Sequence, residues 1–103
     1  MVNNYQKNLG RPGMPPSPNQ QIVLDALKVR CEQMDRDTPN NPGVDIYNLQ
    51  RFMASSELGG WRMHLGAPWH SWHYNTVRAH LDALVHRGHV TKQIIKRSYY
   101  RPV

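Results

Sequence analysis

The fold of this chain is decided by residues 75–90, which read Asn75-Thr76-Val77-Arg78-Ala79-His80-Leu81-Asp82-Ala83-Leu84-Val85-His86-Arg87-Gly88-His89-Val90. Their main apolar members recur with the spacing of one helical stripe, and they are Val77, Leu81, Leu84 and Val85. Gly88 stands where a helix C-cap favours a residue that tolerates positive φ, and basic side chains precede it at the negative end of the helix dipole. The pattern predicts a helix that begins between Ser71 and His73 and ends at Gly88.

The opposite face of this helix is polar and carries small side chains. Its members are Asn75, Thr76, Ala79 and His86, flanked by Arg78 and His80. Amide, hydroxyl and guanidinium groups are the side-chain groups that read base edges in DNA. This face is therefore a candidate surface for contact with nucleic acid.

The residues after Gly88 predict a β-hairpin. Residues 90–94 and 98–101 contain the β-branched and aromatic side chains that favour strands. Residues 95–97, Ile95-Lys96-Arg97, are the expected tip.

Two further helices are predicted upstream. Ser17-Pro18 is typical of a helix start, with Ser as N-cap and Pro in the first turn. This first helix is expected to run to about Arg36, before a loop rich in Pro, Asn and Gly, and its inward positions are Ile22, Val23, Ala26, Leu27, Arg30, Cys31 and Met34. Val44 is expected to form a short strand and Asp45 to cap a second helix. The inward positions of that helix are Ile46, Leu49, Phe52 and Met53.

The C-terminal stretch resembles the recognition helix and wing of the winged helix-turn-helix family. The shared pattern is Thr76-Val77-Arg78, the pair Leu81 and Leu84, then Arg87-Gly88 and Val90, and finally a two-stranded wing. The resemblance is strongest over residues 75–103 and extends in element order over about residues 17–103. It implies an α+β fold, a three-helix winged helix-turn-helix domain with a C-terminal β-hairpin wing and an extended loop between the second and third helices.

That loop departs from the family pattern. Residues 59–70 stand where a helix-turn-helix usually has a turn of about three or four residues. All three tryptophans, Trp61, Trp69 and Trp72, lie in or beside this insert. We expect them to pack on the domain as a small additional core, because Trp carries a large apolar surface. A dimer contact and a stacking platform for unpaired bases are the alternatives that the sequence leaves open.

Charge is distributed unevenly along the chain. The 103 residues, the size of one domain, carry a net charge of +6. Residues 61–103 hold seven of the thirteen Lys and Arg residues but only one of the seven acidic residues, Asp82. A pI of about 9.9 with basic residues gathered in one half is typical of nucleic-acid binding. A solvated basic face that serves only solubility is the alternative.

Residues 1–16 are expected to form a flexible N-terminal arm, and residues 17–103 the winged-helix domain. The density of Pro and Gly in residues 10–16 disfavours helix and strand. Lys7 and Arg11 would allow the arm to reach a DNA groove or backbone, although disorder without a role is the favoured interpretation.

Cysteine content and hydropathy indicate the cellular compartment of the protein. Cys31 is the single cysteine, so no internal disulfide forms, and it is expected to be a small core residue. No apolar run approaches the length of a membrane span or of a signal-peptide core. We therefore expect no membrane association and a cytoplasmic location, or a nuclear one if the source is eukaryotic.

The histidines are the remaining candidates for site chemistry. All six lie between residues 64 and 89, and two pairs, His70 with His73 and His86 with His89, have a spacing that zinc sites use. Zinc sites normally combine such pairs with cysteines or carboxylates, and only the core cysteine is available. We expect no metal, no cofactor and no small-molecule ligand. Without paired inward carboxylates, a Gly-rich phosphate loop or a nucleophile motif, we also expect no enzyme.

The resemblance implies binding to double-stranded DNA in transcriptional control, with the third helix in the major groove and the basic wing on the backbone. Asn75 would contact adenine, and Arg78 would contact guanine or phosphate. The predicted DNA-binding residues are His73, Asn75, Thr76, Arg78, His80, Lys92, Lys96 and Arg97.

Two alternatives belong to other classes. One is a winged-helix protein–protein interaction module of a larger assembly, anchored on exposed tryptophans. The other is a single-stranded DNA or RNA binder that uses the Trp-rich insert. A monomer and a homodimer both agree with the sequence.

Overall fold

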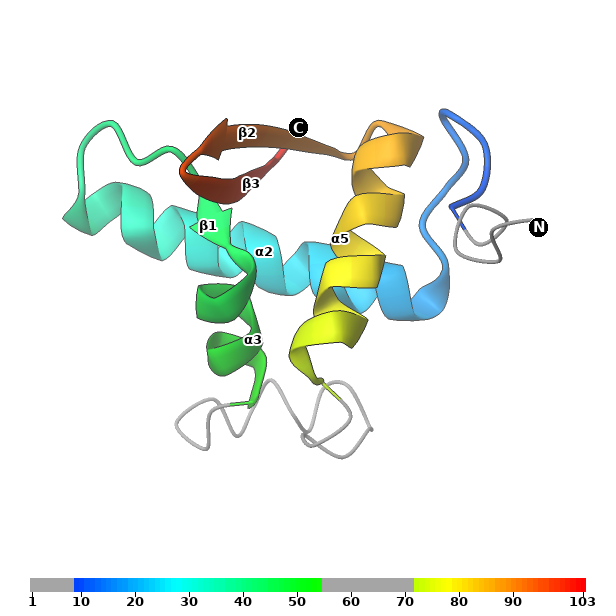
Figure 1. Cartoon of the computed structure of the whole chain (residues 1–103), viewed down its shortest axis with the longest axis horizontal. Helices are drawn as coiled ribbons and strands as arrows, with labels where there is room; N and C mark the ends of the chain where they lie inside the picture. Colours follow the sequence, from blue (N-terminus) through cyan, green and yellow to red (C-terminus); the bar gives the residue numbers. More distant parts are fainter. Residues whose placement is uncertain (1–8, 55–71) are drawn as a thin grey trace.

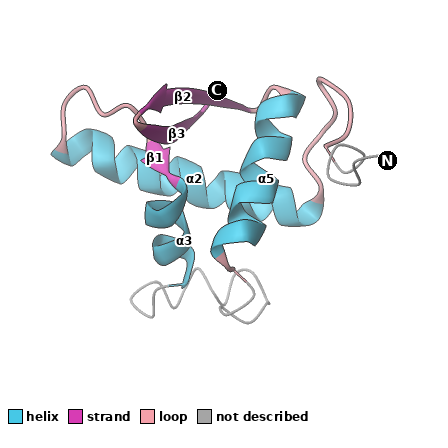
Figure 2. Cartoon of the chain, viewed as in Figure 1, coloured by secondary structure: helices cyan, strands magenta, loops and turns pink. Residues whose placement is uncertain are grey.

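A computed structural model describes residues 9–54 and 72–103, and within these ranges it contains three helices and three short strands. They are α2 (Pro18–Asp37), β1 (Val44–Asp45), α3 (Ile46–Ala54), α5 (Tyr74–Arg87), β2 (Val90–Ile95) and β3 (Arg97–Pro102). In Figures 1 and 2, α2 crosses behind α3 and α5, and the small sheet lies at one end of those two helices. This mixed α+β arrangement is compatible with a winged-helix layout.

Helix α2 begins as the sequence predicts. The Ser17 hydroxyl accepts a hydrogen bond from the Gln20 backbone N–H at 3.4 Å, and the Gln20 side-chain oxygen accepts one from the Ser17 N–H at 2.9 Å. This reciprocal capping box satisfies two backbone donors that a helix start would otherwise leave without partners. The helix ends at Asp37, one residue beyond the predicted end.

Asp45 caps α3, which confirms a second sequence prediction. Its carboxylate accepts a hydrogen bond from the Asn48 backbone N–H at 2.7 Å. The four predicted inward residues of this helix, Ile46, Leu49, Phe52 and Met53, are all buried. The Arg30 side chain joins α2 to α3, because its Nε donates to the Asn48 side-chain oxygen at 2.9 Å and its guanidinium stacks on the Phe52 ring.

The three strands form an antiparallel sheet in the order β1-β3-β2. The hairpin of β2 and β3 is tighter than predicted, because Ile95 pairs with Arg97 and leaves Lys96 alone at the tip. Lys96 has a φ of 64°, a left-handed conformation that reverses the chain at that residue. Just before β1, the chain passes so close to β3 that a Cβ on Gly43 would lie 2.6 Å from the Tyr100 carbonyl oxygen.

One hydrophobic core joins the helices to the sheet. Its fully buried large side chains are Tyr100, Leu27, Leu49, Met53, Leu81, Leu84, Val23, Val44 and Val77. Each buried aliphatic side chain of this size stabilises the fold by about 1.5–3 kcal/mol. Cys31 belongs to this core as predicted, and burial raises the pKa of its thiol. Trp72 also packs into it, whereas Trp61 and Trp69 lie outside the described residues.

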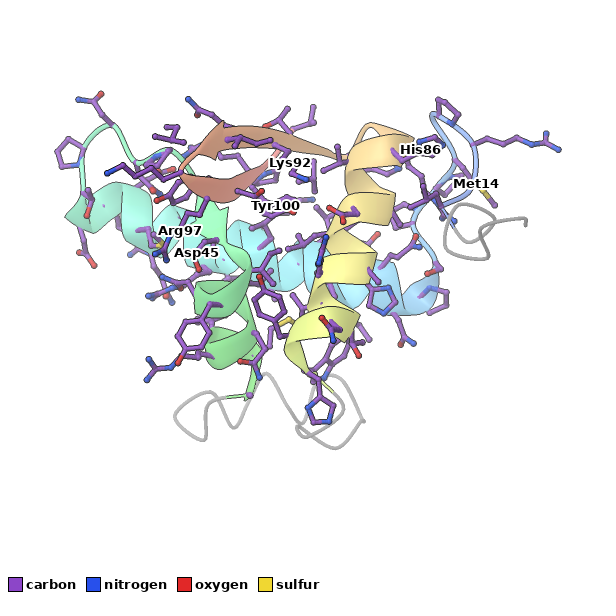
Figure 3. All side chains as sticks on the ribbon, viewed as in Figure 1. Met14, Asp45, His86, Lys92, Arg97 and Tyr100 are labelled. Atoms are coloured by element: carbon purple, nitrogen blue, oxygen red, sulfur yellow. The ribbon has the colours of Figure 1, made fainter. Side chains whose placement is uncertain are left out.

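Helix α5 ends at Arg87, and Gly88, with a φ of 88°, is its C-cap, as the sequence predicts. The preceding Arg87 is 7% exposed and turns toward the N-terminal segment. Its Nε donates to the Leu9 carbonyl at 2.7 Å and its Nη1 to the Pro15 carbonyl at 2.8 Å, while its own carbonyl accepts from the Gly13 N–H at 2.9 Å. Residues 9–16 therefore lie against the C-terminal end of α5 (Figure 3), and the Met14 carbonyl oxygen lies 2.7 Å from the His89 Nε2. The division of the chain at residue 16 stays a prediction.

Candidate nucleic-acid interface

The outward face of α5 is the first part of the candidate interface. Val77, Leu81 and Leu84 bury the opposite stripe in the core, so the predicted face points to solvent. A shallow hollow of about 310 Å³ lies on it and is lined by Asn75, Arg78, Ala79 and Asp82. This hollow offers hydrogen-bond donors and acceptors from amide, guanidinium and carboxylate groups. The small alanine among them lets another molecule approach the surface closely.

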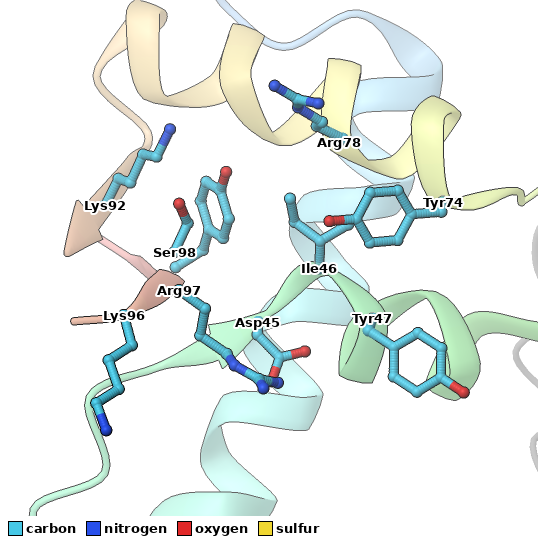
Figure 4. Close-up of a pocket in the computed structure, with 10 residues that line it drawn as sticks. Asp45, Ile46, Tyr47, Tyr74, Arg78, Lys92, Lys96, Arg97 and Ser98 are labelled. Atoms are coloured by element: carbon cyan, nitrogen blue, oxygen red, sulfur yellow. The ribbon is translucent and has the colours of Figure 1, made fainter. Parts of the chain in front are cut away.

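A second and larger hollow lies between α5, the start of α3 and the hairpin. Its volume is about 530 Å³, and its lining residues are Asp45, Ile46, Tyr47, Tyr74, Arg78, Lys92, Lys96, Arg97, Ser98 and Tyr100. Figure 4 shows the hairpin cations on one side of this hollow and the two exposed tyrosines, from α3 and α5, on the other. We call it the tyrosine–lysine hollow. Arg78 lines both hollows, so the two form a continuous surface.

Two carboxylates pair with three of the four cations of this surface. Asp82 lies 3.8 Å from the Arg78 Nε and 3.8 Å from the Lys92 Nζ, and Asp45 lies 3.6 Å from an Arg97 guanidinium nitrogen. Exposed pairs at such distances contribute only about 0–1 kcal/mol each, so an incoming anion can compete for the cations. Among the described residues, no ion pair engages Lys96.

Tyr100 contacts Asp82 from the buried side of the interface. Its hydroxyl donates to the Asp82 carboxylate at 3.1 Å, and its ring lies 5.7 Å from the Lys92 ammonium. Burial, followed by the charge of Asp82, raises the pKa of the Tyr100 hydroxyl, so it stays a neutral donor. The carboxylate is thus fixed between Arg78 on the helix and Lys92 on the hairpin.

Other basic residues of the C-terminal half serve the fold. Arg87 holds the N-terminal segment, as described above. Arg101 donates two hydrogen bonds to the Asp35 carboxylate, at 2.8 and 3.0 Å, and lowers the pKa of that carboxyl. Among the described residues of this half, the positive charge available to a polyanion is therefore gathered on Arg78 and the hairpin.

The structure brings together five of the eight predicted DNA-binding residues. Arg78, Lys92, Lys96 and Arg97 line the larger hollow, and Asn75 lies beside Arg78 in the smaller one. His73 is exposed at the N-cap of α5, and Thr76 is half-buried on its first turn; neither lines either hollow.

His80 lies apart from that group. Its ring centre is 6.3 Å from that of Trp72, and burial lowers the pKa of the imidazole. A half-buried, neutral ring beside the core is poorly placed to contact a phosphate. We therefore leave His80 out of the interface that we propose below.

The tyrosines of the hollow were missed by the sequence reasoning, although a signal for Tyr47 was present. Ile46 and Leu49 fix the inward stripe of α3, so the helical period turns Tyr47 outward, and it is 57% exposed. Tyr74 precedes the predicted face directly and is 45% exposed. What no pattern showed is that residues of two separate helices line the same hollow.

The histidine pairs do not assemble a metal site within the part of the chain that the structure describes. No three His, Cys, Asp or Glu side chains of residues 9–54 and 72–103 lie close enough to hold a metal ion together. His64 and His70 lie outside these ranges. Within the same ranges, no helix combines the length and the apolar character that a membrane crossing requires.

Comparison of the chain with models of known protein families, with curated proteins and with solved structures found no match.

Proposed function

We propose that this protein is a winged-helix domain that binds double-stranded DNA and acts in transcriptional control. The observation that carries the proposal is the convergence of four cations from two elements, Arg78 of α5 and Lys92, Lys96 and Arg97 of the hairpin, around one hollow beside Asn75. Converging cations on an otherwise modestly charged domain favour a polyanionic partner. The sequence resemblance to the winged helix-turn-helix family supports the same partner.

The contacts divide into two kinds in this proposal. Asn75 and Arg78 point from the outward face of α5, and they would read adenine and guanine edges in the major groove. Lys92, Lys96 and Arg97 would contact phosphates and set the orientation of the domain without reading sequence. Asp82 pairs with Arg78 and Lys92, and Asp45 pairs with Arg97, so a phosphate would compete with these carboxylates for the cations.

Two substitutions with matched controls test this division. Arg78→Ala is expected to weaken binding to a selected site by about 1–3 kcal/mol and to relax the preference at one base pair. Lys96→Ala is expected to weaken all sequences evenly and to lower the slope of log affinity against log salt by about 0.9. Arg36→Ala and Lys28→Ala, which remove exposed cations of α2 that line neither hollow, are the controls. Unchanged affinity in both test variants would rule out the helix-in-groove arrangement.

A protein–protein interaction module is the second candidate, and one observation favours it. Ile94 is 72% exposed and Ile95 48% exposed beside the hairpin tip, on opposite faces of β2, and a partner protein that enclosed the tip would cover both. Trp72 cannot be the anchor, because it is buried in the core. Salt separates the candidates: a contact centred on isoleucines is insensitive to ionic strength, whereas DNA binding weakens steeply.

A further inference from the structure

The tyrosine–lysine hollow contains two exposed aromatic side chains that the proposed duplex contacts do not use. Duplex binding uses Asn75 and the four cations, but the helix side of the hollow presents Tyr47 and Tyr74, 57% and 45% exposed. Neither ring belongs to the core cluster. Figure 4 shows them on two separate elements, α3 and α5, across the hollow from the hairpin cations.

The tyrosine rings are suited to stack on a planar ligand. The Arg51 guanidinium lies 5.5 Å from the centre of the Tyr47 ring and covers one of its faces. A cation over one face restricts the ring and leaves the other face for a partner. Ile46 also lines the hollow, beside Tyr74 in Figure 4, and adds a small apolar contribution because it is 7% exposed.

The hairpin half is suited to a phosphate. Lys92, Lys96 and Arg97 line it, and Arg78 closes the upper side in Figure 4, against the single lining carboxylate of Asp45. The hollow therefore has a net positive charge at one end and aromatic surface at the other. Its volume of about 530 Å³ lies within the range of small-ligand sites, about 300–1,000 Å³.

We infer that this hollow binds one unpaired nucleotide, with its base on Tyr47 or Tyr74 and its phosphate on Arg97 and Lys96, the two cations that contact the duplex backbone when no unpaired nucleotide is present. The inference rests on the proposed function and refines it: α5 holds the duplex, and the hollow takes a nucleotide from a single-stranded extension that joins it. The preferred ligand is then a duplex that ends in, or is interrupted by, unpaired nucleotides. A base paired inside a continuous helix has no exposed face to offer to these rings.

The test compares three hairpin DNAs with the same duplex stem: one blunt, one with a 5′ thymine extension and one with a 3′ thymine extension. Affinity is measured by fluorescence anisotropy for the wild-type chain and for two double variants. The first, called the Ala pair, combines Tyr47→Ala with Tyr74→Ala. The second, called the Phe pair, combines Tyr47→Phe with Tyr74→Phe, which keeps the stacking surface and removes only the hydroxyls. Both tyrosines are exposed, so circular dichroism should show an unchanged fold in every variant.

The wild type is expected to bind one of the extended DNAs about tenfold more tightly than the blunt one, the effect of one stacked base. The Ala pair should lose this preference and keep blunt-duplex affinity, while the Phe pair should retain both. Equal wild-type affinity for all three DNAs, or a preference that survives the Ala pair, would overturn the inference and leave duplex binding intact. Binding of the extensions without the blunt stem would instead contradict the proposed duplex function. Binding of none of the DNAs would overturn both.

Discussion

Asp82 is the residue whose replacement tests the electrostatics of the interface most sharply. Its carboxylate lies 3.8 Å from both Arg78 and Lys92, on the surface that we propose for DNA. A carboxylate in that position repels phosphate while it holds the two cations. Asp82→Asn keeps the shape of the side chain and an oxygen for the Tyr100 hydroxyl, and it removes the negative charge.

The size of the effect follows from the distances. A phosphate bonded to Arg78 or Lys92 at roughly 2.8 Å would lie roughly 7 Å from the Asp82 carboxylate. Repulsion between two unit charges at that separation is about 0.6 kcal/mol in water and about 2.4 kcal/mol at an effective dielectric constant of 20. Salt screening acts on this short range only in part. We therefore expect a gain of about 1 kcal/mol, equivalent to about fivefold tighter duplex binding.

The assay is a duplex titration followed by fluorescence anisotropy over a series of salt concentrations. Asp82→Asn should bind more tightly, with a steeper salt dependence because two cations are released toward the phosphates. Loss of two exposed ion pairs should lower the free energy of unfolding by about 1 kcal/mol or less. Asp25→Asn is the matched control, since it makes the same charge change on α2 at a residue that lines neither hollow. A folded Asp82→Asn variant with unchanged or weaker affinity would show that the Asp82 carboxylate does not oppose phosphate at this surface.

Two further predictions concern stability. Gly88→Ala should lower the free energy of unfolding by about 1 kcal/mol, because the backbone is left-handed but the space around the new Cβ is open. Gly43→Ala should lower it further, because the new Cβ would also meet the Tyr100 carbonyl oxygen. Urea unfolding measures both values, and equal losses would contradict the close approach of Gly43 to β3. Burial lowers the pKa of His80 below 6.5, so the unfolded state binds more protons than the folded state. The free energy of unfolding therefore has its highest value above about pH 6.5 and falls as the pH decreases through the folded-state pKa. Its pH dependence, measured by urea unfolding, should be weaker in His80→Gln, and an unaltered pH profile would contradict a half-buried neutral imidazole.

The local signals in the sequence predicted the elements well. Ser17-Pro18, Asp45 and Gly88 each mark a helix boundary through chemistry that acts within a few residues, and each is found in that role. The inward stripes of α3 and α5 also follow from local spacing, because a period of 3.6 residues fixes which side chains share a face. Such features need no knowledge of distant partners.

The remainder depends on partners that are distant in the sequence. The position of Arg87 in the last turn of α5 indicates an interaction with the helix dipole. In the structure its side chain is buried and donates to the carbonyl groups of Leu9 and Pro15. His80 adjoins the polar face by its spacing, but its neighbour in space is Trp72. Periodicity gives the angle of a side chain around its own helix and not the element that packs against it. For the same reason the shared hollow of Tyr47 and Tyr74 appears only in the structure.

One titration decides whether α5 and the hairpin form a surface for double-stranded DNA. Random duplex DNA, single-stranded DNA and RNA are compared by fluorescence anisotropy at a low and a physiological salt concentration. The duplex should bind most tightly, with a log–log salt slope of about −3 to −4 if the four cations each neutralise one phosphate. Absence of duplex binding at low salt, or equal binding to all three nucleic acids, would contradict this proposal.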